Sequence, residues 1–388
     1  MNKKITIAAG SFWPEIGGPA SYIQTILPRL KDAGFNVNLV TRSKKRTYKE
    51  DKTLGYKIFR IKDWSWKPFN YLRFFAKLVK VAKGSDFIYA QGAVSSGLPA
   101  YWANKFLKKK LVLKVTGDYA WEQYSLTNEI IDVMDFQNKK LLGKFKTLRN
   151  IQMKVSRSAD KVIVPSKFLA EVVRHWGVKE EKIHVIYNGT DFEPPSIKKE
   201  EARKEIGISG NIILSAGRLV PWKGLKMLIK LIPELLNKNQ FLRLVIVGAG
   251  PEMEVLNLIK NNLGLNNKVY LVGEKSREEL KTYLAAADMF VLNTAYEGFS
   301  HQILEAMAVG VPIITTNAGG NPELIRQGEN GFMVKYNDEL NLLEAIKAVF
   351  EHKDIREKFI EEGRKTAEKF SVQKMADETT NVFDSLKK

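Results

Sequence analysis

The sequence contains no cysteine and no long apolar run. Without cysteine the chain has no disulfide framework, no thiolate nucleophile and no cysteine-ligated zinc site, and it suits a reducing compartment. No stretch of 18 apolar residues occurs, so no membrane-spanning helix is predicted. The first apolar run is short and is followed by polar residues and glycines, so it predicts a strand and not a signal peptide. We therefore expect a cytoplasmic protein.

Length and charge set two further expectations. A chain of 388 residues exceeds one ordinary domain and suits two of about 190 residues each. The net charge of +19 is unevenly distributed, because residues 1–190 hold 35 Lys and Arg against 15 Asp and Glu, whereas 191–388 hold 27 and 28. Such a charge imbalance is informative about binding partners and not about the fold. The first half is expected to meet something anionic: a membrane surface, an acidic glycan, a lipid phosphate or a nucleic acid.

Short apolar runs alternate with helical patterns along the whole chain, which is typical of parallel α/β sheets. The predicted strands of the first half are 5–10, 36–42, 56–61, 86–91, 110–117, 160–166 and 182–189. Those of the second half are 211–217, 241–248, 268–273, 288–293, 312–316 and 331–335. Between the halves, 192–207 combines two prolines with a charge run and predicts a linker and a short helix. The charged tail 354–388 is predicted to be helical.

The segment 297–325 carries the strongest indication of chemistry. Glu297 precedes Glu305 by eight positions. If a helix begins near Ser300, its free amides and dipole form an anion site, and Glu305 lies about 7.5 Å along the helix axis. One carboxylate can then meet a sugar while the other holds a ribose, with phosphates between them. The alternative is one surface glutamate and one capping glutamate.

A second segment, 215–229, places two cations after a predicted strand. The strand ends at Gly217, and Arg218 and Lys223 follow before an amphipathic helix. A diphosphate leaving group needs positive charge as its bond to a sugar breaks. The chain contains no Asp-x-Asp tripeptide, so two fixed cations are the candidates for the role that a metal ion often has. The alternative for such a pair is solvated surface charge.

Two glycine-containing loops are weaker candidates. Gly17 and Gly18 follow the first predicted strand and can place bare amides against a phosphate, and 247–253 has a similar composition. A plain turn is the alternative for each. Neither loop has the complete glycine fingerprint with an acidic residue about twenty positions later, so a dinucleotide oxidoreductase is not favoured.

Together these motifs resemble the retaining family 4 glycosyltransferases, which have the two-Rossmann GT-B fold. The resemblance covers essentially the whole chain and is most specific in the second half. The matching features are Gly17-Gly18, Gly217-Arg218 with Lys223-Gly224, Val247-Gly248-Ala249-Gly250-Pro251, the Glu297–Glu305 spacing, Leu304-Glu305-Ala306-Met307, and Gly319-Gly320 through Glu323.

The resemblance implies two doubly wound Rossmann-like domains that face each other across a cleft. Residues 1–192 would bind the acceptor and 193–368 the nucleotide sugar, while 369–388 would form a helix that returns to the first domain. The implied reaction moves a hexosyl group from a nucleoside diphosphate sugar to a hydroxyl with retention of configuration. No cofactor and no metal ion are expected.

The resemblance also assigns residues. The implied catalytic residues are Glu297, Arg218 and Lys223, and Asp118 is added as a catalytic candidate from this chain's own sequence. Arg218 and Lys223 would hold the diphosphate, Glu305 the ribose and Glu297 the transferred sugar. The remaining donor contacts are Gly17 and Gly18 against a phosphate, Gly248 in the second glycine loop, and Val272 and Gly273 beside the nucleobase. Gly298, Phe299, Ser300, His301 and Gln302 would lie beside the phosphates.

Two positions depart from the family pattern. Thr116 stands where many relatives have a histidine, which leaves Asp118 as the nearest ionisable group. Asp118 is either an acceptor-site residue or an aspartate that caps its loop. His301 occupies a helix start where relatives often have an aliphatic residue, and it either contacts the donor or faces solvent.

Basic, aromatic stretches fill the first half, at 67–84, 104–110 and 139–157. In the first stretch, Arg73, Lys77 and Lys80 share one face of a predicted helix, which can lie on an anionic bilayer. A helix that covers a sheet with a lysine-rich outer side is the alternative. We expect a peripheral enzyme on the inner face of the cell membrane with an anionic or lipid-linked acceptor and no nucleic-acid partner. The alternative functions are a sugar-nucleotide epimerase, a phosphorylase, or a basic nucleic-acid-binding protein.

Overall fold

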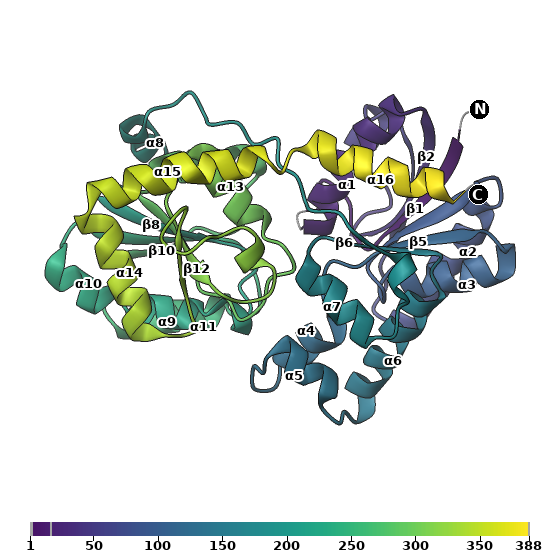
Figure 1. Cartoon of the computed structure of the whole chain (residues 1–388), viewed down its shortest axis with the longest axis horizontal. Coiled ribbons are helices and arrows are strands. Elements are labelled where there is room, and N and C mark those ends of the chain that lie inside the picture. The colour runs from purple at the N-terminus through teal and green to yellow at the C-terminus, as the bar shows by residue number, and fades with distance from the viewer. Residues whose placement is uncertain (1–2, 16–17, 387–388) are drawn as a thin grey trace. The chain divides into compact units, whose positions relative to one another are not determined.

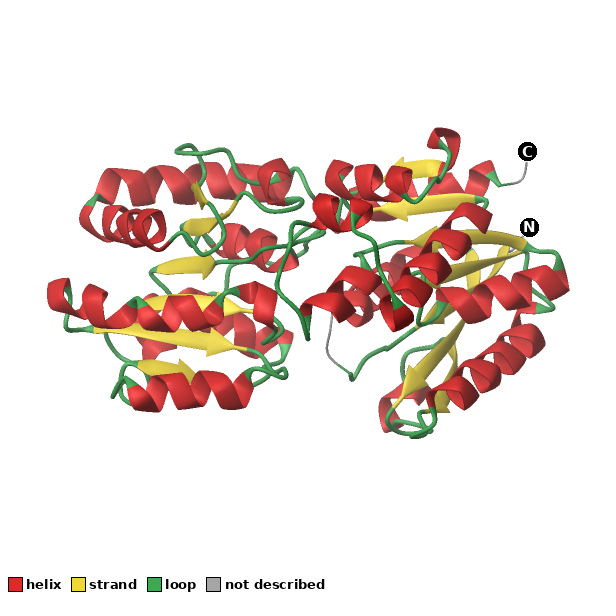
Figure 2. Cartoon of the chain, turned by 90° about the horizontal axis from the view of Figure 1, so that it is seen from below, coloured by secondary structure: helices red, strands yellow, loops and turns green. Residues whose placement is uncertain are grey.

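A computed structural model describes residues 3–15 and 18–386 (Figure 1). The chain divides into two compact units, residues 1–124, 133–188 and 372–388 in the first and 125–132 with 189–371 in the second. The chain passes to the second unit at Gly189 and returns at Val372, compared with 193 and 369 predicted from the sequence. Each unit has helices on both faces of one sheet (Figure 2).

The first unit is built on a seven-stranded, fully parallel sheet in the order β3-β2-β1-β4-β5-β6-β7. Its strands are β1 Lys3–Ala9, β2 Phe35–Ser43, β3 Lys57–Lys62, β4 Phe87–Gln91, β5 Lys110–Lys114, β6 Lys161–Val164 and β7 Ile183–Val185. Its helices are α1 Gly18–Asp32, α2 Lys67–Ala82, α3 Gly97–Leu107, α4 Tyr119–Ser125, α5 Val133–Asn138, α6 Gly143–Ser158, α7 Lys167–His175 and α16 Val372–Ser385.

The order of the strands decides which helices share a face. The connection from β1 to β2, which contains α1, runs toward one edge of the sheet. The connections from β3 to β4 and from β4 to β5, which contain α2 and α3, run toward the other edge. Because such crossovers are right-handed, α1 lies on one face of the sheet and α2 and α3 on the other. The terminal helix α16 packs beside α1 (Figure 1). Its Phe383 ring lies 4.9 Å from that of Phe87 and 5.0 Å from that of Tyr89. The last helix therefore completes the core of the first unit.

The second unit repeats the architecture with six parallel strands in the order β10-β9-β8-β11-β12-β13. Its strands are β8 Asn211–Ala216, β9 Leu242–Val247, β10 Val269–Leu271, β11 Met289–Leu292, β12 Ile313–Thr316 and β13 Phe332–Val334. Its helices are α8 Lys199–Ile206, α9 Leu225–Lys230, α10 Ile232–Lys238, α11 Met253–Asn262, α12 Arg277–Ala286, α13 His301–Val309, α14 Glu339–Glu351 and α15 Lys353–Glu368.

The predicted fold class is confirmed, since both sheets are parallel and doubly wound. Each strand segment predicted from the sequence overlaps one of the observed strands, with bounds that differ by one or two residues for β1, β2 and β3. The second sheet reverses direction at β8, because β9 and β10 follow on one side and β11 to β13 on the other. Ligands of such sheets bind at the carboxyl ends of the strands beside this reversal. A ligand is therefore expected beside the carboxyl ends of β8 and β11.

Candidate donor site

The loops after β8 and β9 bring bare backbone together. Gly217 and Gly248 follow the two strands with φ of +148° and +142°, which side-chain-bearing residues rarely adopt. A Cβ on Gly248 would lie 1.9 Å from the carbonyl oxygen of Gly217, and one on Gly250 would lie 2.3 Å from that of Leu219. Only glycine fits these positions. They bring the backbone of neighbouring loops into close contact at the edge of the sheet where a ligand is expected.

Lys223 and Glu297 meet across the reversal of the sheet. Lys223 ends a short 3-10 turn after β8, Glu297 lies in the loop after β11, and the Lys223 ammonium donates to the Glu297 carboxylate. The two side chains are only 11% and 13% exposed. Arg218, one residue beyond Gly217, is exposed, and its guanidinium lies 5.5 Å from the centre of the Trp222 ring. The site thus combines the ion pair of Lys223 with Glu297 and the exposed guanidinium of Arg218.

Buried amides hold these two loops together. Asn293, directly after β11, donates at 3.1 Å to the carbonyl of Gly224 and at 2.9 Å to Asn337. The backbone amide of Asn337 in turn donates at 3.0 Å to Asn293. A Cβ on Gly224 would stand 2.3 Å from the Asn293 side chain, which explains that glycine. Asn293 and Asn337 were not predicted from the sequence, because their role depends on the adjacency of β8, β11 and the loop after β13.

The helix that the sequence predicted near Ser300 is α13. The Ser300 hydroxyl caps it by accepting from the amide of Ile303 at 3.3 Å. The backbone of Glu297 is fixed by the following glycine turn, because the Gly320 amide donates to its carbonyl at 2.9 Å. A Cβ on Gly319 would approach that carbonyl to 2.0 Å. Gly298, Phe299 and Ser300 are buried, whereas His301 and Gln302 are half-buried.

Glu305 lies in the second turn of α13 in a charged setting. Burial raises its pKa to about 7, while Arg277 favours the ionised form and Asp191 opposes it. Arg277, the first residue of α12, forms an ion pair with Asp191 and lies over the Phe192 ring. With this pKa, Glu305 is close to half-ionised at neutral pH.

The strand β10 ends beside the same glycine loops. The amide of Gly248 donates to the carbonyl of Gly273 at 2.8 Å, and the amide of Val272 donates to that of Ile246 at 3.1 Å. The predicted donor contacts from Gly217 to Glu305 are thus gathered along one edge of the second sheet. Their roles stay predictions, since the geometry alone assigns no ligand.

Comparisons with known families identify the chain. Residues 198–366 match the family model of the glycosyl transferases group 1, and residues 16–194 match that of Glycosyltransferase Family 4. The chain belongs to the family 4 glycosyltransferases. An uncharacterised glycosyltransferase of Methanocaldococcus jannaschii is 32% identical over 231 residues, which span 57% of this chain and 59% of that protein.

Two further similarities extend over more of the chain. The alpha-monoglucosyldiacylglycerol synthase of Streptococcus pneumoniae is 26% identical over 83% of this chain and 72% of its own length. The crystal structure of Anabaena HepE in complex with UDP-glucose superposes with a TM-score of 0.80 at 21% identity, covering 98% of this chain and 99% of that one. This structural likeness supports the GT-B fold.

The candidate residues in the first unit of this glycosyltransferase lie in different settings. Gly17 lies outside the described residues, and Gly18 is the exposed first residue of α1. Asp118 is fully buried and accepts hydrogen bonds from Gln152 at 2.7 Å, from Gln137 at 2.9 Å and from the amide of Trp121 at 2.9 Å. Burial raises the pKa of Asp118. This geometry is that of the capping alternative, and a contact with the acceptor stays a prediction.

A buried lysine at the end of β5 was not singled out from the sequence. Lys114 is inaccessible to solvent, and its ammonium group has no hydrogen-bond partner among the residues that the structure describes. It lies 3.9 Å from the centre of the Tyr22 ring. Burial lowers its pKa to about 7. The run Lys110–Lys114, with apolar residues on both sides of its last lysine, was the available indication.

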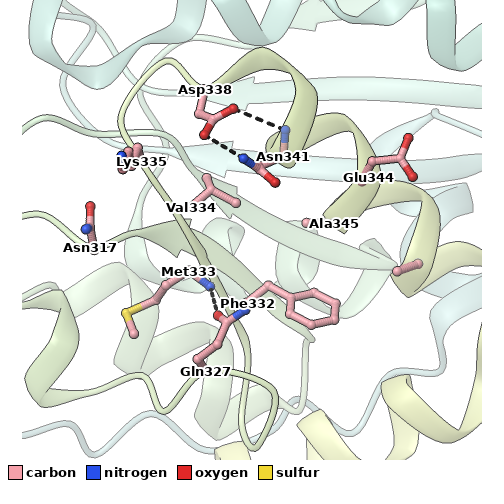
Figure 3. Close-up of a pocket in the computed structure, with 11 residues that line it drawn as sticks. Asn317, Gln327, Phe332, Met333, Val334, Lys335, Asp338, Asn341, Glu344 and Ala345 are labelled. Atoms are coloured by element: carbon pink, nitrogen blue, oxygen red, sulfur yellow. Dashed lines mark hydrogen bonds between the residues drawn. The ribbon is translucent and has the colours of Figure 1, made fainter.

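A pocket of about 530 Å³ lies apart from the predicted donor residues, between β13 and α14 (Figure 3). Several polar groups of its wall are hydrogen-bonded to each other. Asp338 accepts from Asn341, and the Met333 amide donates to the Gln327 side chain at 2.6 Å. None of the predicted site residues lines it. In residues 3–15 and 18–386 no three His, Asp or Glu side chains gather as ligands for a metal ion. No helix of the described chain is long and apolar enough to cross a membrane.

Proposed function

We propose that this glycosyltransferase moves a hexosyl group from a nucleoside diphosphate sugar to a hydroxyl acceptor with retention of configuration. The observation that carries the proposal is the Lys223–Glu297 ion pair at the reversal of the second sheet. It joins a cation suited to a diphosphate with a carboxylate suited to sugar hydroxyls, next to bare glycine backbone.

The reaction breaks the bond between the anomeric carbon and the diphosphate oxygen and forms a bond from that carbon to the acceptor oxygen. In the ion pair Lys223 neutralises Glu297. When a donor binds, Lys223 and Arg218 compensate the charge that grows on the departing diphosphate, and Glu297 is released to accept from the sugar hydroxyls. The departing phosphate oxygen takes the proton of the acceptor on the same face. No protein base and no metal ion are then required.

Glu305 and the start of α13 complete the proposed donor contacts. The free amides at this helix start favour a phosphate, and a carboxylate in the second turn can accept from both ribose hydroxyls. Val272 and Gly273 lie at the carboxyl end of β10, where a planar base can be covered. This arrangement does not select among UDP, GDP and ADP.

The acceptor is proposed to be anionic or lipid-linked, at the inner face of the cell membrane. The positive charge of residues 1–190 supports this, as does the likeness to a synthase that is named for a glycolipid. A sugar-nucleotide epimerase or a phosphorylase is the second candidate, because such enzymes can have the same two-domain architecture, but the Glu297–Glu305 segment argues against it.

A donor screen tests the proposal. The full chain is incubated with a panel of nucleotide sugars and lipid extracts, and products are followed by mass spectrometry and the anomeric configuration by NMR. Glu297→Gln is the variant, and Glu254→Gln, which changes an exposed carboxylate of α11, is the control. Epimerised donor without transfer, or a requirement for inorganic phosphate, would select the second candidate.

A further inference from the structure

The outer stripe of α2 is apolar although it faces solvent. Every fourth residue from Asn70 to Ala82 is buried against the sheet, as expected of a helix that covers one face. The opposite stripe should then be polar. It consists of Pro68, Leu72, Ala76 and Lys80, all of them exposed. Three of the four side chains are apolar, which a soluble sheet-covering helix does not require.

The neighbouring helix extends this apolar surface. The helices α2 and α3 pack along each other (Figure 1). The ring of Phe75 meets that of Trp102 edge-on at 6.3 Å, which brings the two outer faces together. Trp102 and, one turn later, Phe106 are exposed on α3.

The loop before α2 adds two tryptophans in a fixed position. The Trp64 amide donates to the buried Asn70 side chain at 2.9 Å, and Asn70 donates back to the Trp64 carbonyl at 2.7 Å. The Trp66 ring stacks on Phe69 at 6.3 Å. We call Trp64, Trp66, Leu72, Trp102 and Phe106 the aromatic surface, and its side chains are 38% to 72% exposed. The two hydrogen bonds fix the backbone of Trp64, and the stacking on Phe69 orients the Trp66 ring, so both exposed tryptophan rings have defined positions.

Cations border the aromatic surface almost without anions. Residues 63–109 contain eight Lys and Arg and two acidic residues, Asp63 and Asp86. Asp63 forms an ion pair with Arg42, and the Asp86 carboxylate accepts from the Lys4 amide at 2.8 Å, at the amino end of the sheet. Arg73 and Lys77 lie against the Trp64 and Phe59 rings, whereas Lys80 and Lys105 are exposed. The surface is therefore apolar at its centre and positive at its rim.

We infer that the aromatic surface docks on an anionic bilayer, with its rings at the boundary between headgroups and acyl chains and the surrounding lysines against lipid phosphates. Tryptophan and lysine are the residues that suit this boundary, because each has an apolar body and a polar end. The centres of protein–protein interfaces are instead depleted of lysine. The inference deepens the membrane contact of the proposed function and does not depend on which sugar is transferred.

The structure also changes the role that each side chain of α2 is expected to have in membrane binding. Arg73, Lys77 and Lys80 were predicted to share a helix face that can lie on an anionic bilayer, yet Arg73 and Lys77 lie against aromatic rings. Attraction by exposed lysines gives the preference for anionic lipid, and burial of the rings gives binding that salt does not fully reverse. Adhesion by charge alone would be lost in salt.

The test uses the full chain and vesicles of phosphatidylcholine, alone or with one quarter phosphatidylglycerol, at 0.15 and 0.5 M salt. The variants are Trp64→Ser/Trp66→Ser and Leu72→Ser/Phe106→Ser. The control is Phe241→Ser/Leu340→Ser, two side chains of the second unit that are 70% and 75% exposed. Partitioning is measured by co-sedimentation, and insertion of the wild-type tryptophans by quenching with brominated lipids.

We expect each variant to lose at least tenfold in partitioning, the control to match wild type, and part of the wild-type binding to survive 0.5 M salt. Lys80→Glu/Lys105→Glu should abolish the preference for the anionic vesicles. Wild-type binding by both aromatic variants, complete reversal by salt, or no quenching by brominated lipid would overturn the inference. Nucleotide binding, followed by thermal shift in the same preparations, reports separately on the donor site.

Discussion

Replacement of Lys114 by methionine is expected to stabilise the first unit. Methionine keeps the length and flexibility of the side chain but removes an ammonium group that is buried without a hydrogen-bond partner in the described part of the chain. An unpaired buried charge is costly because it loses its water without compensation. The nearest compensation is the face of the Tyr22 ring at 3.9 Å.

The magnitude follows from the pKa of Lys114. Its fall from 10.5 to about 7 means that the folded protein binds this proton less tightly than the unfolded chain does. At about 1.4 kcal/mol per pH unit, this fall makes the charged lysine cost the folded protein roughly 5 kcal/mol. We therefore expect Lys114→Met to raise the free energy of unfolding by about 5 kcal/mol below pH 7.

The pH dependence gives the sharper test. Between pH 7 and 10.5 the unfolded chain holds the proton and the folded protein does not, so wild-type stability from this group rises with pH. The advantage of the methionine variant must shrink over the same interval and vanish near its upper end. Tyr22 and Tyr89 do not interfere, because burial raises the pKa of Tyr22 to about 12 and that of Tyr89 well above 10.

Urea unfolding at pH 6.5, 8 and 9.5 measures this effect, with pulsed hydrogen exchange of peptides from β4 and β5 to follow the first unit by itself. Lys110→Met is the matched control, since Lys110 begins the same strand but is exposed and paired with Asp160. It should change stability by less than about 1 kcal/mol. A destabilised Lys114→Met variant, or an advantage that does not change with pH, would refute the reasoning.

Four further outcomes are expected. Affinity for the donor should rise about tenfold from pH 6 to pH 8 as Glu305 ionises, and Glu305→Gln should bind more weakly with a flat profile, measured by calorimetry. Glu297→Gln should lower kcat more than affinity in steady-state assays, because its sugar contact strengthens in the transition state. Activity should persist in excess EDTA, and loss restored by magnesium would contradict this. Gly248→Ala should abolish nucleotide binding in thermal-shift assays, because its Cβ would meet the Gly217 carbonyl at 1.9 Å.

The sequence predicted local structure well because the relevant interactions are local. Alternating apolar runs located both sheets, and glycines directly after strands marked where backbone approaches backbone. The spacing from Glu297 to Glu305 located α13 and its cap at Ser300. Each of these patterns lies within a few residues of the strand, helix or turn that it predicts.

What the sequence did not predict depends on contacts between distant residues. Asn293 binds Gly224 and Asn337 only because β8 and β11 are neighbours in the sheet. A lysine-rich outer side of α2 was the alternative considered from the sequence. The exposed stripe Pro68, Leu72, Ala76 and Lys80 is instead mainly apolar, and two other cations of the helix lie over rings of the loop and sheet. The periodicity of a helix locates its buried face but does not reveal such side-chain contacts.

The place of α16 in the first unit has a consequence for synthesis. On the ribosome, β1 to β7 emerge early, but Val372, Met375 and Phe383, which close their core, emerge only after all of Gly189–Ser371. The second unit can therefore fold while the first still exposes the face of α1 and the Phe87 ring. During that interval the nascent chain presents an apolar groove that chaperones can recognise. A premature stop near Ser371 would leave this groove permanently open, so such truncated chains should be degraded and not accumulate as half-active enzyme.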